Sequence, residues 1–238
     1  LDTDHCKRLA NDVDQLEKDR EETGTRPTVV SYRELGLLTS EPKVMGRVED
    51  LMGTPFALHH IHATRQGPGT RASRWHQDYE QTPQTNRSHL MIHVFFYLNG
   101  LNGEIGDLLV LPKSHTKVTA NNTFGIFGTE DLPGSLTFNN LAPGTAVVVY
   151  SALQHARRAK PGGENTPRFF IDSSYCQSGI LWPGDSYYEI TNQTALETGL
   201  DRNGRYAFVY DSSNFFDRKA YHEMLTPKNQ GSLALQLK

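Results

Sequence analysis

The sequence predicts a mainly β protein, a double-sheet jelly roll with helices flanking it at the N-terminus. From Phe56 to Cys176, short β-branched and aromatic runs alternate with Gly, Pro, Asn and Asp, which is typical of sandwiches and barrels. Before Phe56, apolar residues recur at helical spacing instead. At 238 residues, a single domain is expected, with supporting helices in 1–55, a β core in 56–176 and a C-terminal extension in 177–238.

The first expected helix is amphipathic. Leu9, Val13 and Leu16 lie at i, i+4 and i+7 among charged residues, so they form one narrow apolar stripe. Gly24 and Pro27 are expected to end this helix.

A second helix is expected before the β core. The pair Thr39 and Ser40 can cap it, Pro42 suits its first turn, and Gly53 is expected to end it. Both helices are expected to support the fold and to take no part in chemistry. The apolar face of the second helix is expected to consist of Val44, Val48 and Leu51.

Eight short strands are expected in the β core. Turn residues at 67–69, 99–100, 102–103 and 143–144 separate some of them. This number of short strands favours a jelly roll. The expected strands are 56–64, 74–79, 89–98, 108–111, 135–138, 146–150, 155–159 and 168–176, and the less regular C-terminal extension is expected to add one more at 206–210.

The composition excludes several classes of partner. The 24 basic and 27 acidic residues give a formal net charge of -3, which argues against a broad nucleic-acid surface. The apolar run 146–150 is far shorter than the roughly 20 residues that cross a bilayer, so no membrane association is expected. Cys6 and Cys176 are far apart, which argues against a disulfide scaffold and for a reducing, cytoplasmic compartment.

The segment 74–78, Arg-Trp-His-Gln-Asp, is the first that carries chemistry. In an extended segment, side chains at i and i+2 project to the same face, so His76 and Asp78 are expected to point together. An imidazole and a carboxylate are two thirds of the 2-His-1-carboxylate set that binds non-haem Fe(II). About one His-x-Asp/Glu triplet is expected by chance in such a composition, so the motif needs support from elsewhere in the chain.

Two downstream residues supply that support. His155 follows one apolar strand, and Arg168 begins the next. A guanidinium at the mouth of a barrel can bind a carboxylate through two parallel hydrogen bonds. The alternative for Arg168 is a structural ion pair with Asp172 or Glu164.

Together, these residues resemble a known family. His76-Gln77-Asp78, the segment 106–115 (Gly-Asp-Leu-Leu-Val-Leu-Pro-Lys-Ser-His), His155 and Arg168 are similar to the phytanoyl-CoA dioxygenase family of Fe(II)- and 2-oxoglutarate-dependent oxygenases. The resemblance covers about residues 56–176 and implies a double-stranded β-helix, a cupin-like form of the jelly roll. It also implies that His76, Asp78 and His155 bind Fe(II) and that Arg168 holds the distal carboxylate of 2-oxoglutarate.

The resemblance implies oxidoreductase chemistry with O2 as a further co-substrate. Members of that family convert 2-oxoglutarate to succinate and CO2 while they hydroxylate an unactivated C–H bond. Related halogenases have a small residue in place of the carboxylate, so Asp78 favours hydroxylation. Two departures concern the cofactor pocket: Ala156-Arg157-Arg158 follows His155 where relatives have Gly-Ser-Gly, and Lys113 stands where glycine is usual.

Several residues have more than one interpretation. His93 is expected to contact 2-oxoglutarate as a hydroxyl does in relatives, whereas Gln77 points away from the ligand face and suits a structural role equally well. Arg157 and Arg158 alternate across the sheet; one that faces the cavity would favour an anionic substrate, and two outside would form a solvated edge. His60 and His62, at i and i+2, could ligate a metal, but no acidic partner lies nearby in the sequence; strand residues with satisfied imidazoles are therefore expected at His59, His60 and His62.

Three functions remain open on the sequence. The first is an Fe(II)- and 2-oxoglutarate-dependent dioxygenase that hydroxylates a small-molecule metabolite. The second is a cupin-like Zn or Mn hydrolase or isomerase, which would use the same three ligands but has no need of Arg168. The third is a non-catalytic jelly-roll binding module, against which the complete ligand set argues. Neither the substrate nor the oligomeric state follows from the residues.

Overall fold

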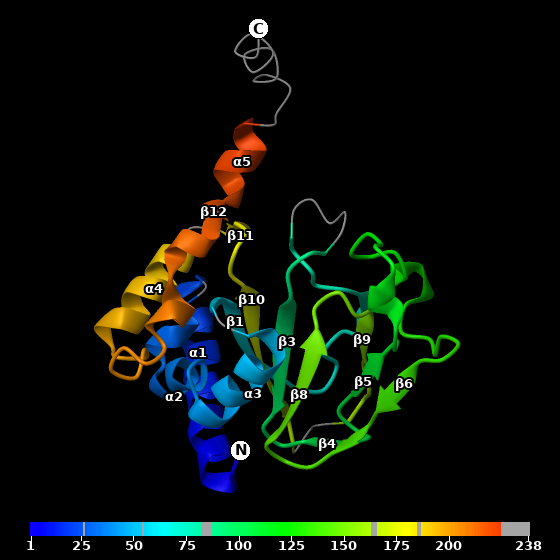
Figure 1. The fold of residues 1–238 in the computed structure, drawn as a ribbon. Coiled ribbons are helices and arrows are strands. Elements are labelled where there is room, and N and C mark those ends of the chain that lie inside the picture. The colour runs from blue at the N-terminus through cyan, green and yellow to red at the C-terminus, as the bar shows by residue number, and fades with distance from the viewer. Residues whose placement is uncertain (26, 54, 82–86, 163–165, 185–186, 225–238) are drawn as a thin grey trace, which may run out of the picture.

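A computed structural model describes residues 1–25, 27–53, 55–81, 87–162, 166–184 and 187–224. The described chain forms three layers: a group of helices, a four-stranded sheet against which they pack, and a second four-stranded sheet on the far side (Figure 1). The mainly β architecture with N-terminal helices, as predicted, is confirmed. Of the described helices, none is both long enough and apolar enough to span a membrane.

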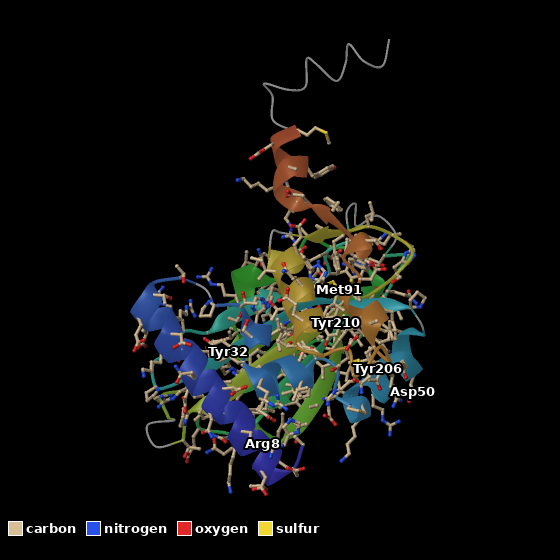
Figure 2. All side chains as sticks on the ribbon, turned by 90° about the vertical axis from the view of Figure 1, so that its left-hand side faces the viewer. Arg8, Tyr32, Asp50, Met91, Tyr206 and Tyr210 are labelled. Carbon is tan, nitrogen blue, oxygen red and sulfur yellow. The ribbon has the colours of Figure 1, made fainter. Side chains whose placement is uncertain are left out.

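The helical layer is built from four helices: α1 (Thr3–Thr23), α2 (Arg33–Leu38), α3 (Pro42–Met52) and α4 (Tyr187–Glu197). The predicted α1 buries Leu9, Val13 and Leu16, and Gly24 ends it in the left-handed conformation. Figure 2 shows α1 in blue across the face that this layer turns to the viewer, with its many charged side chains in solvent.

The two sheets are antiparallel throughout. We call them the helix-backed sheet and the second sheet. The eight strands predicted for the β core all occur, each within a few residues of its expected bounds. The helix-backed sheet has the order β1 (Phe56–Gln66), β10 (Arg168–Gln177), β3 (Met91–Tyr97), β8 (Thr145–Tyr150), and the second sheet the order β2 (Ser73–His76), β9 (His155–Arg158), β5 (Asp107–Val110), β6 (Leu136–Phe138).

Two further pairs of short strands complete the described sheet structure: β4 (Leu101–Asn102) with β7 (Asn140–Leu141), and β11 (Trp182–Gly184) with β12 (Phe215–Asp217). The second pair ties the C-terminal extension to the core. After β12, the short helix α5 (Arg218–Met224) extends away from the body of the molecule (Figure 1) and buries none of its residues.

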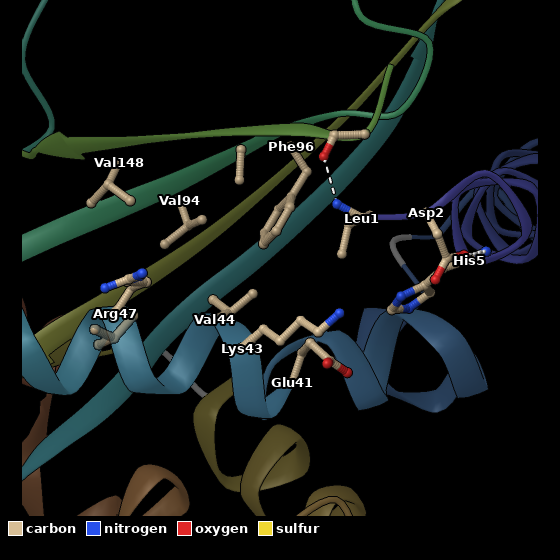
Figure 3. A pocket seen from close by; sticks show the side chains of 13 residues that line it. Leu1, Asp2, His5, Glu41, Lys43, Val44, Arg47, Val94, Phe96 and Val148 are labelled. Carbon is tan, nitrogen blue, oxygen red and sulfur yellow. Dashed lines mark hydrogen bonds between the residues drawn. The ribbon is translucent and has the colours of Figure 1, made fainter. Parts of the chain in front are cut away.

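Alternation along β3 separates a structural face from a chemical one. Val94 and Phe96 point to the helices and join the large apolar core, whereas Phe95 and Tyr97 point to the second sheet. A cavity of about 340 Å³ lies on the structural face, between α3 and the helix-backed sheet (Figure 3). This cavity lies on the face of β3 that points away from Phe95. It is therefore separate from the candidate site described below.

The predicted start of α3 is wrong in detail. Thr39 and Ser40 are fully buried, and their hydroxyls bond Tyr210 and the Leu200 carbonyl, so the tertiary contact takes the groups that a local cap would use. Glu41 occupies the cap position without a side-chain bond. The apolar face is also shifted: Leu51 is 54% exposed, and Met45 and Met52 are buried in its place.

The strand predicted at 206–210 is also wrong. Residues Ala207–Tyr210 form a 3₁₀ turn, whose Val209 and Tyr210 pack into the helical core. These residues pair with no strand in the described part of the chain; the turn packs instead against β1 and α4, where Phe208 meets Phe56 edge to face. Cys6 and Cys176 are both buried and free, as the absence of a disulfide scaffold predicts.

Gly106 sets the approach between β5 and β9. Its φ is +115°, and an ideal Cβ would lie 2.8 Å from the carbonyl oxygen of Arg158 in β9. Gly106→Ala is therefore expected to lower the free energy of unfolding by about 2–4 kcal/mol, because a side chain there meets both backbone strain and fixed backbone. Chemical denaturation of both proteins measures the difference.

Gly134 provides the matched control for this substitution. Its φ is also positive, +82°, but an added Cβ would have nothing within 4 Å. Gly134→Ala is expected to cost only the conformational part, about 1–2 kcal/mol. If both variants lose the same free energy of unfolding, the close packing of β5 on β9 does not depend on Gly106.

Candidate metal and cofactor site

Pairing of β2 with β9 brings two of the predicted ligands together. His76 ends β2 and His155 begins β9, and the two are direct partners in the antiparallel register. Their ring centroids are 4.3 Å apart. Trp75 is fully buried on the opposite face of the second sheet with Leu109 and Ala156, so alternation turns His76 toward the space between the sheets.

Asp78 reaches the same place by a different route from the one predicted. The strand ends at His76, so the alternation of an extended segment does not place Asp78. Its backbone N–H instead donates to the Ser151 carbonyl at 2.8 Å, which ties it to the end of β8. Its carboxylate lies 3.5 Å from His76 Nε2 through Oδ1 and 3.2 Å from His155 Nε2 through Oδ2.

The hydrogen bonds of the two imidazoles leave their Nε2 atoms available as metal ligands. His76 Nδ1 donates to the Arg74 carbonyl at 2.6 Å, and His155 Nδ1 donates to the Leu153 carbonyl at 3.1 Å. In a neutral ring, the other nitrogen then carries a lone pair. Two lone pairs and a carboxylate, all within 4.8 Å of one another, form an acceptor set that suits a divalent cation.

The electrostatics of the three residues agree with this arrangement. Burial would raise the pKa of the Asp78 carboxyl, but the imidazoles around it, His155 above all and then His93 and His76, outweigh burial and hold this pKa well below its usual range. Burial and the neighbouring His155 lower the pKa of His76. The site therefore presents an ionised carboxylate and a neutral His76 imidazole at neutral pH, the protonation states that metal binding requires.

Arg168 lies in the same cavity as these three residues. The cavity has a volume of about 240 Å³, and its lining includes His76, Asp78, His155 and Arg168. The guanidinium is 2% exposed and stacks over the rings of Tyr97 and Phe170 at 5.0 and 5.2 Å.

Two nitrogen atoms of the Arg168 guanidinium are free to bind a ligand. Nε and Nη1 have no hydrogen-bond acceptor among the described residues. Asp172 is not its ion-pair partner as the alternative interpretation required, because His93 holds that carboxylate; Glu164 lies outside the described residues. A buried guanidinium with two free donors is expected to take an anion from solution, and a carboxylate fits it.

The two arginines after His155 separate as alternation predicts. Arg157 lines the cavity, whereas Arg158 pairs with Asp107 and Asp131 outside it. The Nη atoms of Arg157 donate to the carbonyls of Thr70 and Arg71, and its Nε has no acceptor in the described chain. Burial and the nearby Arg168 lower the pKa of Arg157 to about 10, so it remains a cation.

Other side chains near the candidate site have structural surroundings. Gln77 is buried and bonds Asn121 and the Tyr79 N–H, which agrees with the structural interpretation of this residue. Lys113 has a φ of +64°, a conformation in which glycine is favoured. The aromatic residues Tyr79, Tyr175 and Trp182 are fully buried.

A family model described as phytanoyl-CoA dioxygenase matches residues 2–158, more than half of the chain. The chain belongs to the phytanoyl-CoA dioxygenase family. The matched region contains His76, Asp78 and His155 and ends before Arg168. No curated protein matches the chain at a significant level.

Several solved structures have a similar fold. A ThoJ–Ni complex, a non-haem monooxygenase, is matched over 86% of this chain and 91% of its own, with a TM-score of 0.58 and 13% identity. AviO1 from Streptomyces viridochromogenes Tue57 is matched over 74% of this chain and 86% of its own, with a TM-score of 0.57 and 16% identity. HygX from Streptomyces hygroscopicus, with nickel and 2-oxoglutarate bound, is matched over 74% of this chain and 81% of its own, with a TM-score of 0.55 and 14% identity.

This member of the phytanoyl-CoA dioxygenase family has a second polar cluster, which sequence reasoning missed. His93 Nδ1 donates to both carboxylate oxygens of Asp172 at 2.9 Å, and His60 Nε2 lies 3.8 Å from Asp172 Oδ2. Of these residues, Asp172 lines the cavity. The position of Asp172 could have been predicted from the strand that begins at Arg168, because residues 168, 170 and 172 face the same side of a strand. A contact between His93 and 2-oxoglutarate stays a prediction.

The His93–Asp172 pair makes a pH dependence of stability expected. Burial lowers the pKa of His93, but the charge and hydrogen bond of Asp172 raise it to about 9, above the usual value of about 6.5. A raised pKa contributes stability that is complete below the unfolded value and is lost as the pH rises through the folded value. The iron-free protein is therefore expected to lose on the order of 3 kcal/mol of unfolding free energy from this pair between about pH 6 and about pH 10.

Chemical denaturation across this range measures the loss, and His93→Asn is the control. Without the imidazole, this part of the pH dependence should vanish, and only the part common to both proteins should remain. An unchanged slope in His93→Asn would mean that His93 is not the group that titrates.

Proposed function

We propose that the protein is an Fe(II)- and 2-oxoglutarate-dependent dioxygenase that hydroxylates a small anionic metabolite and releases succinate and CO2, with O2 as the second co-substrate. We also propose that its two sheets form a double-stranded β-helix. Their strands alternate along the chain, with β1, β3, β8 and β10 in one and β2, β5, β6 and β9 in the other, which supports a jelly roll.

One observation carries this proposal: a facial set of metal-ligand atoms shares a cavity with an arginine that has free donors. The Nε2 atoms of His76 and His155 and the carboxylate of Asp78 would hold Fe(II). Arg168 would hold the distal carboxylate of 2-oxoglutarate through Nε and Nη1. When bound, iron with 2-oxoglutarate and O2 supplies the oxidising power that breaks a C–H bond.

The chain's own residues orient and shield these groups. The carbonyls of Arg74 and Leu153 fix the two imidazole rings, which keeps their Nε2 atoms directed at one point. Phe95 contacts His155 with ring centroids 5.5 Å apart, and Phe170 packs against Phe95 at 5.4 Å. These rings form an apolar wall, which limits the access of water to the reacting groups.

Arg157 supports an anionic substrate. It lies in the cavity beside Arg168, and its Nε has no acceptor in the described chain. Two guanidinium groups at one end of a cavity of about 240 Å³ make that end strongly attractive to carboxylates or phosphates. The second function, a metal hydrolase or isomerase, does not explain why Arg168 is buried with two nitrogen atoms, Nε and Nη1, that have no hydrogen-bond acceptor among the described residues.

Removal of one ligand tests the metal assignment. Under anaerobic conditions, Fe(II) and 2-oxoglutarate together are expected to give a visible charge-transfer band with the wild-type protein, and His76→Ala should abolish it because the facial set is incomplete. His62→Gln, which removes an exposed imidazole from β1, is the control and should retain the band. Absence of the band from folded, iron-loaded wild-type protein would refute the proposed function.

Arg168 distinguishes the dioxygenase from the hydrolase. Arg168→Ala is expected to weaken 2-oxoglutarate binding by roughly tenfold to a hundredfold, because a charge-assisted pair of hydrogen bonds is lost. Arg65→Ala, which removes an exposed arginine paired with Asp14, should leave binding unchanged. Calorimetry with 2-oxoglutarate measures both, and unchanged binding in Arg168→Ala would favour the metal hydrolase.

A further inference from the structure

A chain of polar side chains runs along the helix-backed sheet to the wall of the candidate site. His59 and His60 are neighbours at an irregularity in β1, where the register shifts between Leu58 and His60. His59 Nε2 lies 3.2 Å from the Pro183 carbonyl, and His59 Nδ1 lies 2.8 Å from His60 Nδ1. The other end of His60, Nε2, points to Asp172.

The direction of each hydrogen bond in this chain follows from its first member. A carbonyl can only accept, so His59 Nε2 must donate to Pro183. Burial and the neighbouring His60 keep the pKa of His59 well below its usual value, so its ring is neutral and its Nδ1 accepts. His60 Nδ1 therefore donates to His59, and an imidazole that carries its single proton on Nδ1 has its lone pair on Nε2.

That lone pair faces another acceptor. Asp172 Oδ2 is 3.8 Å from His60 Nε2, beyond hydrogen-bond distance. Each carboxylate oxygen of Asp172 accepts one bond from His93 Nδ1 and retains capacity for a second. Two acceptor atoms therefore face each other with room for one donor atom between them, at about 2.9 Å from each.

The distances favour a hydrogen-bond donor over a second metal ion. His93 Nδ1 is committed to Asp172 at 2.9 Å, and its Nε2 lies 3.4 Å from the Ser174 hydroxyl. His60, His93 and Asp172 are close enough to surround a metal, but among these three residues just His60 Nε2 and the Asp172 carboxylate remain open, fewer than the three or four protein ligands that transition metals usually take. In the candidate iron site, by contrast, backbone carbonyls hold both Nδ1 atoms, so both Nε2 atoms are left as ligands beside Asp78.

Position places the Asp172 side of this acceptor pair at the candidate site. Asp172 lines the same cavity as His76, Asp78, His155 and Arg168, and His60 Nε2 lies 3.8 Å from its carboxylate. Asp172 follows Arg168 by four residues on one face of β10, a separation of roughly 13 Å along a strand. The cavity thus has cationic arginines toward one end and the Asp172 carboxylate toward the other.

We propose that His60 Nε2 and Asp172 Oδ2 bind an N–H or O–H donor of the primary substrate, an ammonium or a hydroxyl group. This inference rests on the proposed function and refines its substrate: an anion that also carries a donor group, such as an amino or hydroxy acid. His59 and His93 act as positioning residues, because each holds one acceptor in the required orientation without touching the substrate.

Nuclear magnetic resonance of ¹⁵N-histidine protein tests the arrangement directly. With diamagnetic Zn(II) in place of iron and 2-oxoglutarate added, His59 is expected as the Nε2–H tautomer and His60 as the Nδ1–H tautomer. Propylamine and propanediol should each shift the His60 Nε2 signal in a saturable manner, whereas propionate, which has no donor, should not. The amine and the diol distinguish an ammonium from a hydroxyl as the preferred group.

Two variants connect the shift to the acceptor pair. Asp172→Asn is expected to weaken binding of the better probe by about tenfold or more, since an acceptor on a charged group is lost. His60→Asn should do the same, which guards against a folding defect in Asp172→Asn. His222→Gln, which removes an exposed imidazole from α5, should bind the probe as the wild type does.

Several outcomes would overturn the inference. They are a His60 ring protonated on Nε2 at neutral pH, an equal shift with propionate, or unchanged probe affinity in both Asp172→Asn and His60→Asn. A second equivalent of Zn(II) that is lost in His60→Asn but kept in His76→Ala would also overturn it, in favour of a metal site.

Failure of this inference can be told apart from failure of the proposed function. If the protein binds neither iron nor 2-oxoglutarate but donor probes still shift His60, the acceptor pair is a binding site and the dioxygenase assignment falls. If the anaerobic band forms and the probes leave His60 unchanged, the dioxygenase assignment stands and the acceptor pair does not bind substrate.

Discussion

The antiparallel pairing of β2 with β9 is the contact on which the candidate site depends. It places His76 opposite His155, and the burial of Trp75 on the far face decides which way His76 turns. The close contact at Gly106 also allows β9 to pack against β5. The strand that carries His155 is therefore held on one side by β2 and on the other by β5. A rigid frame of this kind preorganises the two imidazoles and the carboxylate so that they converge on one point.

Hydrogen-bond direction is the second organising constraint. In the candidate iron site, backbone carbonyls orient His76 and His155 so that acceptors face inward. Along β1, the Pro183 carbonyl has the same effect on His59 and, through it, on His60. His76, Asp78, His155 and Asp172 therefore present acceptors to the cavity, while Arg157 and Arg168 present donors. Under the proposed function, this polarity would divide the cavity between a cation, an anionic co-substrate and a substrate donor group.

The eight core strands could be predicted from the sequence, because each is a short β-branched or aromatic run bounded by turn residues. The same reasoning failed where a tertiary contact competed with a local one. Thr39 and Ser40 suit a helix cap, yet Tyr210 and Leu200, more than 150 residues away along the chain, take their hydroxyls. Residues 206–210 are an apolar and aromatic run like those of the core strands, yet they pair with no strand in the described part of the chain and form a turn that packs against β1 and α4.

For the site, the sequence alone determined the residue types and their order: His76 and Asp78, a distant His155, and Arg168 at the start of a strand. Only the tertiary structure decided that Arg157 lies inside and Arg158 outside, and that Asp172 joins His93 and His60 at the wall of the cavity. The physical reason is that strand parity specifies which side chains share a face, whereas the cluster of residues 60, 93 and 172 requires three strands in register. Register across strands is set by side-chain packing and turns far from the residues themselves, so it cannot be obtained from a local pattern.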